Sequence, residues 1–288
     1  MTAVTAVKYI SADGVDVFYR EAGQPDAPVV LLLHGYPTSS FSYRNLIVRL
    51  AEKYRVIAPD LPGFGFTNVP AERNYQYTFA NFAKTVEAFA DALKLKHYAL
   101  YIFDYGAPTG LRLALARPDA VTAIISQNGN AYVEGLGAFW DNLRPYWASQ
   151  TTENRESIRW LTSFDATKWQ YVTGEKDPSA IPPETYHLDS ALLARPGNAD
   201  IQLDIFLDYR TNVELYPAFQ QFFRQHKPPI LAIWGKNDEI FIPQGANAFK
   251  TDAPDAEVVL VDGGHFVLEN HLDEVADAIL KFLGKKLV

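Results

Sequence analysis

The chain has 288 residues, 48% of them hydrophobic, which suits one large domain or a core domain with an inserted cap. Its formal net charge of −8 and its pI of about 5.3 argue against nucleic acid and anionic membrane surfaces as partners, because no basic surface is supplied. The absence of cysteine excludes disulfides, thiolate metal sites and a cysteine nucleophile, and it fits a reducing compartment.

Targeting and membrane signals are missing from the sequence. The N-terminus lacks a basic stretch followed by an apolar run, so we predict no signal peptide. No stretch approaches the ~18 uninterrupted apolar residues that a transmembrane helix needs. We therefore expect a soluble cytoplasmic protein without membrane partners, and the sequence leaves a monomer and a homodimer both open.

Strand and helix patterns alternate along the first part of the chain. Two short strand-like runs come first, and the next run, 29–33, is entirely apolar, as in a strand buried on both faces of a parallel sheet. The alternation predicts a doubly wound, mostly parallel sheet with helices on both faces. The expected strands are 7–10, 15–19, 29–33, 55–59, 98–103 and 121–126, and the expected helices are 42–53, 78–93 and 107–116.

The alternation stops near Asn128. Residues 131–227 hold many aromatic side chains and no clear strand, and proline and glycine break up their helical patches. We interpret this stretch as a helical cap inserted into an α/β core domain formed by residues 1–130 and 228–288. The helical patches are 158–163 and 201–209, and the core resumes with strands at 230–234 and 258–261 and a helix at 272–283.

The segment Phe103-Asp104-Tyr105-Gly106 carries the strongest chemical signal. A strand that runs directly into a small residue and a helix is typical of a nucleophile elbow, the strained turn that projects one side chain at the carboxyl edge of a sheet. The nucleophile position holds a carboxylate, so we expect attack on an electrophilic carbon through an ester, not serine-type acyl transfer. A helix N-cap is the alternative interpretation of Asp104.

The turn His34-Gly35-Tyr36-Pro37 follows the apolar strand predicted at 29–33. At this position the backbone N–H of Tyr36 is expected to point into the site. Together with the backbone N–H of Tyr105 it would form an oxyanion hole. An ordinary strand-ending turn is the alternative.

An acid and a histidine follow the last two predicted strands. Asp238 closes a glycine-containing turn after strand 230–234, and the neighbouring Glu239 is the alternative acid. His265 follows two glycines after strand 258–261, and it alone of the six histidines combines this position with this context. The order nucleophile, acid, histidine matches the triad order of α/β sheet hydrolases. We therefore expect Asp238 to orient His265 as general base.

With these motifs the sequence resembles the α/β-hydrolase superfamily. It looks like the branch with an aspartate nucleophile, which includes epoxide hydrolases, haloalkane dehalogenases and fluoroacetate dehalogenases. The resemblance covers almost the whole chain, although the cap matches only at spots. It implies the α/β-hydrolase fold, catalysis by Asp104, Asp238 and His265, and no metal or organic cofactor.

The resemblance to epoxide hydrolases implies cap tyrosines that protonate the departing alkoxide. The segment Asp208-Tyr209-Arg210 resembles the Tyr-Arg segment that carries one such tyrosine, which assigns the role to Tyr209. For the second donor we expect Tyr146, with Tyr132 as the second choice. Packing is the alternative for each, because the chain has 16 tyrosines and cap tyrosines often only pack.

The resemblance to dehalogenases keeps a second activity open. Haloalkane dehalogenases expel a halide, which needs N–H donors, and usually carry Asn in the His-Gly-x-Pro motif and Trp after the nucleophile. This chain has Tyr36 and Tyr105 at those positions, so Trp140 or Trp147 in the cap would have to supply a donor. Fluoroacetate dehalogenases carry arginines just after the nucleophile, which this chain lacks, so an acidic substrate is not expected.

The sequence therefore predicts an epoxide hydrolase that converts a small apolar organic substrate and water into a diol. Besides the residues above, we expect His34, Trp140 and Trp147 to contact the substrate. The alternatives are a haloalkane dehalogenase with the same nucleophile and a non-catalytic small-molecule receptor on the same fold. A serine esterase is disfavoured because the elbow holds no hydroxyl.

Overall fold

The computed structural model of the protein describes residues 4–286, and within them eight strands form one sheet in the order β1-β2-β4-β3-β5-β6-β7-β8. β2 pairs antiparallel with both β1 and β4, and all the other neighbouring strands are parallel. The strands are β1 (Ala6–Ala12), β2 (Val15–Ala22), β3 (Val29–Leu33), β4 (Arg55–Pro59), β5 (Tyr98–Phe103), β6 (Val121–Gln127), β7 (Ile230–Gly235) and β8 (Glu257–Val261).

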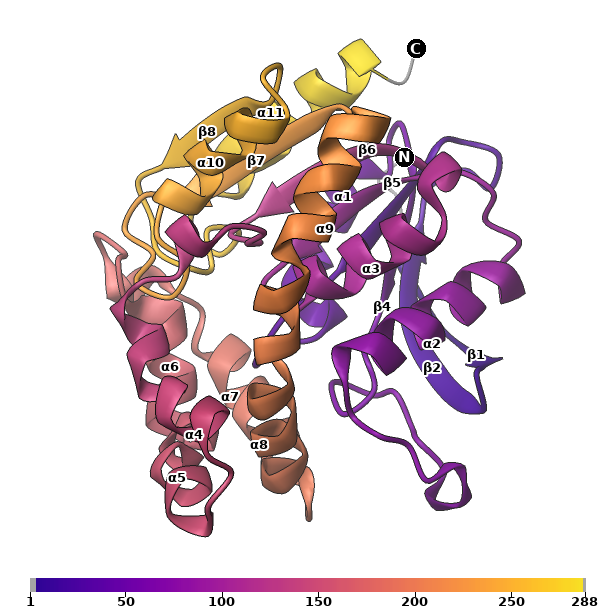
Figure 1. Ribbon diagram of the computed structural model, residues 1–288. Helices are drawn as coiled ribbons and strands as arrows, with labels where there is room; N and C mark the ends of the chain where they lie inside the picture. Colours follow the sequence, from indigo (N-terminus) through magenta and orange to yellow (C-terminus); the bar gives the residue numbers. More distant parts are fainter. Residues whose placement is uncertain (1–3, 287–288) are drawn as a thin grey trace.

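Helices cover both faces of the sheet (Figure 1). Along β3, Leu31 and Leu33 join the core beneath α2 and α3, whereas Val30 and Leu32 join the core beneath α1 and α11. This burial on both faces explains the all-apolar strand, and it confirms the doubly wound, mostly parallel sheet. The α-helices are α1 (Arg44–Leu50), α2 (Phe79–Ala92), α3 (Gly106–Ala116), α4 (Arg144–Ala148), α5 (Thr152–Ser157), α6 (Phe164–Val172), α7 (Pro183–Leu193), α8 (Asn198–Asp208), α9 (Arg210–His226), α10 (Gln244–Asp252) and α11 (Leu272–Lys286).

The chain between β6 and β7, residues 131–227, is called the helical segment below. It contains α4 to α9 and short 3-10 helices, and it adds no strand to the described sheet. Figure 1 shows α4 to α8 grouped together and α9 running from them toward the core. The ring of Tyr36, just past β3, lies 4.9 Å from that of Phe206 on α8, and its hydroxyl donates to the Leu161 carbonyl. The helical segment therefore lies over the carboxyl ends of the strands.

Several helices differ from the sequence prediction. Helix α9 was not predicted, and the helical patch expected at 158–163 is the 3-10 helix Arg159–Thr162. The helix expected at 42–53 begins as a 3-10 turn, Ser40–Tyr43, because the Ser39 side chain caps the N–H of Phe41. Helix α10 was not predicted, since Gly245 and Asn247 near its start have weak helix propensity. Packing selects it: a Cβ on Gly245 would lie 2.9 Å from the Cα of Gly135, so glycine permits this close contact.

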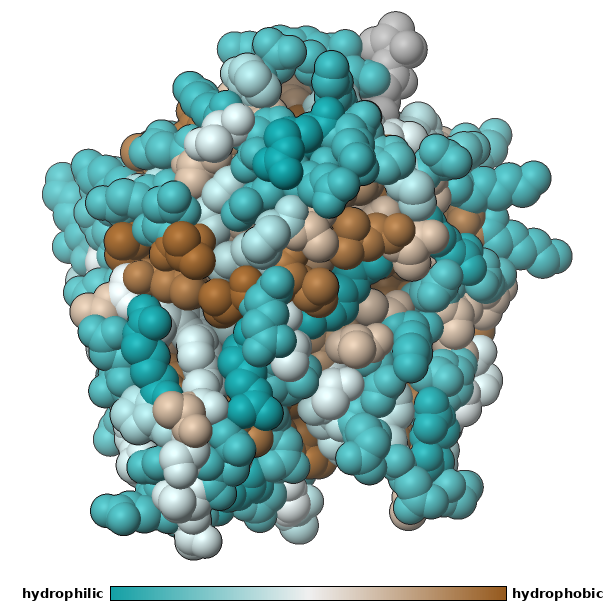
Figure 2. Space-filling model, viewed as in Figure 1, coloured by the Kyte–Doolittle hydropathy of each residue, from teal (hydrophilic) through white to brown (hydrophobic). Residues whose placement is uncertain are grey.

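The face of the molecule seen in Figure 1 is mostly hydrophilic, with a band of hydrophobic side chains across its middle (Figure 2). Such bands are where a surface can meet an apolar partner or ligand. Among the helices of residues 4–286, none is both long and apolar enough to cross a bilayer.

Candidate active site

Asp104 lies at the turn between β5 and α3 with a φ of +48°. A non-glycine residue in this left-handed region costs on the order of 1–3 kcal/mol, so the surrounding contacts must hold it there. Two glycines permit those contacts. A Cβ on Gly106 would lie 1.9 Å from the Leu33 carbonyl oxygen, and a Cβ on Gly35 would lie 2.2 Å from the Cβ of Asp104. The turn thus has the tight geometry of a nucleophile elbow.

Backbone N–H groups converge on the Asp104 carboxylate. The N–H of Tyr36 donates to Oδ1 at 2.6 Å, and the backbone N–H of Tyr105 also lowers the pKa of the carboxyl group. The side chain is almost completely buried, and burial raises the pKa of Asp104 to about 6 against the opposing effects of the His265 charge and the two N–H bonds. These donors could also hold an oxyanion that forms on the same carboxyl carbon.

His265 joins Asp104 to Asp238. Its Nδ1 lies 2.8 Å from Oδ2 of Asp238, and its Nε2 lies 3.9 Å from Oδ2 of Asp104. Nε2 is buried and has no hydrogen-bond partner within residues 4–286. Burial lowers the pKa of His265, but attraction and hydrogen bonding to Asp238, together with the charge of Asp104, outweigh it and raise the pKa overall. The free Nε2 beside the carboxylate is placed to accept a proton.

Three N–H donors hold the Asp238 carboxylate, and one of them, Asn128, was not predicted from the sequence. Its Oδ1 accepts the N–H groups of Ile240 and Phe241 at 2.8 and 3.2 Å, and its Oδ2 accepts the side-chain N–H of Asn128 at 2.7 Å. Asn128 directly follows β6 with a φ of +45°, and a polar residue at a strand's carboxyl end was the signal available for it. The alternative acid, Glu239, is exposed to solvent, so the geometry favours Asp238.

Tyr209 lies buried where α8 meets α9. Its ring centroid lies 4.2 Å from that of Trp140 and 6.0 Å from that of Tyr105. Burial raises the pKa of Tyr209 well above its usual value, and the charge of Asp104 contributes to the rise. The Tyr209 hydroxyl lies 3.4 Å from that of Tyr216, which is seven residues further along on the same helix face. Tyr216 was not among the residues predicted from the sequence.

The other two cap tyrosines have different surroundings from those expected. The hydroxyl of Tyr146 accepts a hydrogen bond from Arg155 at 3.0 Å, and Arg155 also binds the solvent-exposed carboxylate of Asp204. The hydroxyl of Tyr132 is buried and feels the charge of Asp252. The sequence could not tell which way each hydroxyl points: that of Tyr146 is bonded to Arg155 and that of Tyr132 lies near Asp252, so the role of either as a proton donor stays a prediction.

The tryptophan rings line the space around Tyr209, but their N–H groups are already bonded. The indole N–H of Trp140 donates to the Ile240 carbonyl and that of Trp147 to the Phe206 carbonyl, both at 2.8 Å. The ring of Trp147 stacks on that of Tyr209 at 6.1 Å. The two indole rings can therefore contact a substrate as an apolar wall, but their N–H groups are not free to donate to it.

His34 is a structural residue in this arrangement. The N–H of Leu61 donates to its Nε2 at 2.9 Å, which makes Nε2 the acceptor nitrogen. Nδ1 therefore carries the proton and lies 3.0 Å from the Gly35 carbonyl oxygen. The ring is completely buried, and burial lowers its pKa. Because both nitrogens are bonded to backbone groups, one to Gly35 and one to Leu61, the expected substrate contact of His34 is not supported.

Tyr105 contributes more than a backbone N–H. Its hydroxyl is buried and has no hydrogen-bond partner within residues 4–286. Its ring centroid lies 5.8 Å from that of Tyr36 and 6.0 Å from that of Tyr209, in the layer between the strand ends and the helical segment. Burial and the nearby charge of Asp104 raise the pKa of this hydroxyl well above its usual value, so it stays protonated.

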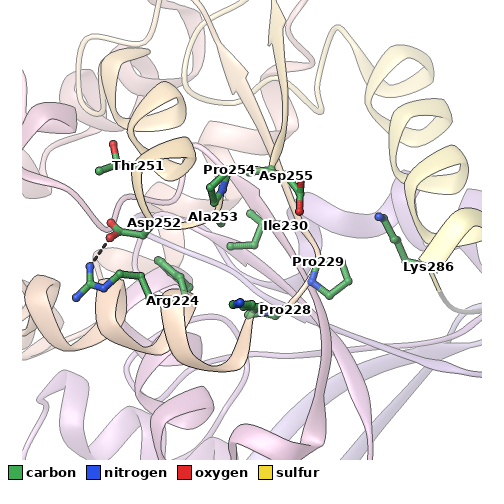
Figure 3. Close-up of a pocket in the computed structure, with 13 residues that line it drawn as sticks. Arg224, Pro228, Pro229, Ile230, Thr251, Asp252, Ala253, Pro254, Asp255 and Lys286 are labelled. Carbon is green, nitrogen blue, oxygen red and sulfur yellow. Dashed lines mark hydrogen bonds and ion pairs between the residues drawn. The ribbon is translucent and has the colours of Figure 1, made fainter.

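A pocket of about 470 Å³ lies away from this site (Figure 3). It is formed by the end of α9, the end of α10 and the start of β7, and includes the ion pair between Arg224 and Asp252. Because Ile230 begins β7 and Asp104 follows the end of β5, the pocket lies at the opposite edge of the parallel sheet. A separate groove of about 640 Å³ beside Trp169 reaches Asp238.

The chemistry available at this site is nucleophilic attack, proton abstraction and proton donation. Asp104 supplies a carboxylate, His265 supplies a base oriented by Asp238, and the hydroxyls of Tyr105 and Tyr209 can supply protons or hydrogen bonds. Within residues 4–286, no three side chains of metal-binding types converge as a candidate metal site.

Comparison with known proteins agrees with this geometry. The family model described as "alpha/beta hydrolase fold" matches residues 28–272, and the chain belongs to this family. An uncharacterized hydrolase of Saccharomyces cerevisiae is 46% identical over 95% of both chains. Haloalkane dehalogenase 2 of Mycobacterium bovis is 28% identical over 89% of this chain and 88% of its own. An epoxide hydrolase structure from Vigna radiata superposes with a TM-score of 0.77 at 23% identity, covering 98% of both chains. The protein is therefore a hydrolase of the α/β-hydrolase fold.

Proposed function

We propose that this hydrolase opens an epoxide to a diol through a covalent ester on Asp104. The observation that carries the proposal is the kind of donor found around the nucleophile. The buried donors of Tyr105 and Tyr209 are hydroxyls, whereas the indole N–H groups of Trp140 and Trp147 are bonded to backbone carbonyls. A departing alkoxide needs a proton, which a hydroxyl can give; a departing halide needs only a hydrogen bond.

In the first step Asp104 attacks an epoxide carbon. A bond forms between the carboxylate oxygen and that carbon, the ring C–O bond breaks, and Tyr209 transfers its proton to the departing oxygen. The carboxylate loses its negative charge when it becomes an ester, and the charge passes to Tyr209, which has lost its proton. The total charge of the site is therefore unchanged.

In the second step water cleaves the ester. His265, oriented by Asp238, takes a proton from water while the hydroxide adds to the ester carbonyl, and the N–H groups of Tyr36 and Tyr105 hold the oxyanion. Collapse releases the diol oxygen, which receives the proton from His265. Asp104 is left as a carboxylic acid, and loss of its proton to the tyrosine phenolate restores the starting state.

Tyr105 takes the place of Tyr146 as the second donor in this proposal. Its hydroxyl is buried and has no protein partner within residues 4–286, and its ring lies beside that of Tyr209. A buried hydroxyl without a partner costs about 1–3 kcal/mol, which a bound epoxide oxygen would offset. The helical segment then serves as the cap that carries Tyr209 and closes an apolar site over Asp104.

Haloalkane dehalogenation is the second candidate function. It is favoured by the 28% identity to haloalkane dehalogenase 2 and by the shared need for a carboxylate nucleophile. Styrene oxide and 1-bromobutane supplied in parallel separate the two. We expect diol from styrene oxide and no bromide release. Bromide release without any diol would replace the epoxide proposal with the dehalogenase one.

A further inference from the structure

A chain of hydrogen bonds runs away from Asp104 behind Tyr209. The hydroxyl of Tyr216 lies 3.4 Å from that of Tyr209, and the side-chain N–H of Asn130 donates to the Tyr216 hydroxyl at 3.2 Å. All three residues are almost completely buried. The Tyr–Tyr separation is longer than a typical O–H···O bond, as is common for catalytic hydrogen bonds in ligand-free proteins, which shorten in the complex.

The direction of the protons in this chain follows from Asn130. Its Oδ1 accepts the backbone N–H of Tyr132 and its Nδ2 donates to the Tyr132 carbonyl at 2.7 Å, which fixes the amide orientation. Asn130 therefore presents an N–H to Tyr216, whose own proton must be donated elsewhere. The nearby acceptor is the Tyr209 oxygen. The proton of Tyr209 is then free to point toward a bound substrate.

The surroundings also decide which oxygen best holds a negative charge. Burial raises the pKa of Tyr216 to about 12, although the hydrogen bond shared with Tyr209, the bond from Asn130 and the charge of Arg112 lower it. The pKa of Tyr209 lies well above its usual value. Asn130 bonds the hydroxyl of Tyr216 and not that of Tyr209. Arg112 donates to the Pro108 carbonyl and to Thr211 and Asn212 on α9, and its positive charge lowers the pKa of Tyr216.

We propose that Tyr216 is a positioning residue that, together with Asn130, orients the proton of Tyr209 toward the leaving oxygen and accepts the negative charge when that proton departs. This inference rests on the proposed function. As the Tyr209 O–H bond breaks and its proton joins the epoxide oxygen, the Tyr216 proton moves to the Tyr209 oxygen. Tyr216 becomes the phenolate, and the Asn130 N–H holds it. The Asp104 acid formed by hydrolysis later returns one proton to the pair.

The test compares leaving groups of different basicity in a His265→Gln background, where the ester accumulates. The rate of adduct formation is measured by mass spectrometry with 1,2-epoxypropane and with its 3,3,3-trifluoro analogue, whose alkoxide is less basic. Tyr216→Phe is expected to slow the reaction of 1,2-epoxypropane about tenfold or more, which is part of the 10²–10⁴-fold contribution of general acid catalysis. The slowing of the trifluoro epoxide is expected to be clearly smaller.

Tyr98→Phe is the matched control, because Tyr98 at the start of β5 is also buried with a hydroxyl that has no partner within residues 4–286. It is expected to change neither rate. Equal slowing of both epoxides by Tyr216→Phe, or no slowing, overturns the role of Tyr216 and leaves the ester mechanism standing. If no adduct forms with Tyr216 intact, the proposed function fails and this inference fails with it.

A second variant covers the case in which Tyr216→Phe does not fold. Replacement of Tyr216 by 3-fluorotyrosine keeps the ring and the hydroxyl but makes the hydroxyl more acidic. The proposed charge transfer then predicts faster adduct formation with 1,2-epoxypropane and a smaller difference between the two epoxides. An unchanged difference overturns the proposal.

Discussion

The carboxyl edge of the sheet and the helical segment above it position their polar groups in different ways. Asp104, Asp238 and His265 each follow a strand, and the parallel ladders bring those strand ends together whatever the intervening sequence. Tyr209 and Tyr146 lie on helices whose direction depends on side-chain packing. Residues at strand ends can therefore be assigned from sequence order, whereas residues on the covering helices need coordinates.

The largest expected loss of activity follows from a change at the carboxyl edge of the sheet. Asp104→Ala should lower turnover of styrene oxide by about 10⁴-fold or more, because no other group can form the ester. Asp252→Asn, which changes a buried carboxylate at the opposite edge, is the matched control and should retain activity. Steady-state diol production measures both. Retained activity in Asp104→Ala would remove the nucleophile assignment.

The next effect compares two tyrosines of the helical segment. Tyr209→Phe removes the proposed proton donor and should lower the rate of ester formation by about 10²–10⁴-fold. Tyr146→Phe removes a hydroxyl that accepts a hydrogen bond from Arg155 and should change that rate less than about threefold. Single-turnover kinetics with styrene oxide distinguishes the two. The opposite ranking would show that the donor assignment is wrong.

The extent of sequence prediction follows the same division. The strand at 98–103, the elbow after it and the His265 position were predictable because strands buried on both faces read as apolar runs that end abruptly. Local patterns did not predict three features: the orientation of Tyr146, the use of both His34 nitrogens and the Tyr209–Tyr216 contact. Each depends on a helix rotation or a partner distant in the chain, which local patterns do not encode.

A smaller effect examines the packing that supports the elbow. In Gly35→Ala the new Cβ would lie 2.2 Å from the Asp104 Cβ, so the carboxylate must shift. We expect about a 10²-fold loss of activity and a loss of about 1–3 kcal/mol in the free energy of unfolding. Gly284→Ala on α11 is the control, because its Cβ would meet nothing within 4 Å. Denaturant unfolding and activity assays that show equal effects for both would contradict this account.

The last effect is on stability alone and depends on pH. The folded-state pKa of Asp104 is raised from 3.8 to about 6, so its contribution to stability is present below about pH 4 and is lost as the pH rises through about 6. Asp104→Asn should therefore raise the free energy of unfolding by up to about 3 kcal/mol at pH 8 and by little at pH 4. Urea unfolding at both pH values measures this. An equal gain at both would show that the buried charge is not the cause.

The most direct test of the ester is intact-protein mass spectrometry of His265→Gln after incubation with styrene oxide. Without the base that activates water, the account predicts a protein whose mass rises by one substrate molecule, with the added mass on the peptide that contains Asp104. The double variant His265→Gln, Asp104→Asn should show no such increase. An unmodified His265→Gln protein, or an adduct on any other residue, would contradict the central claim.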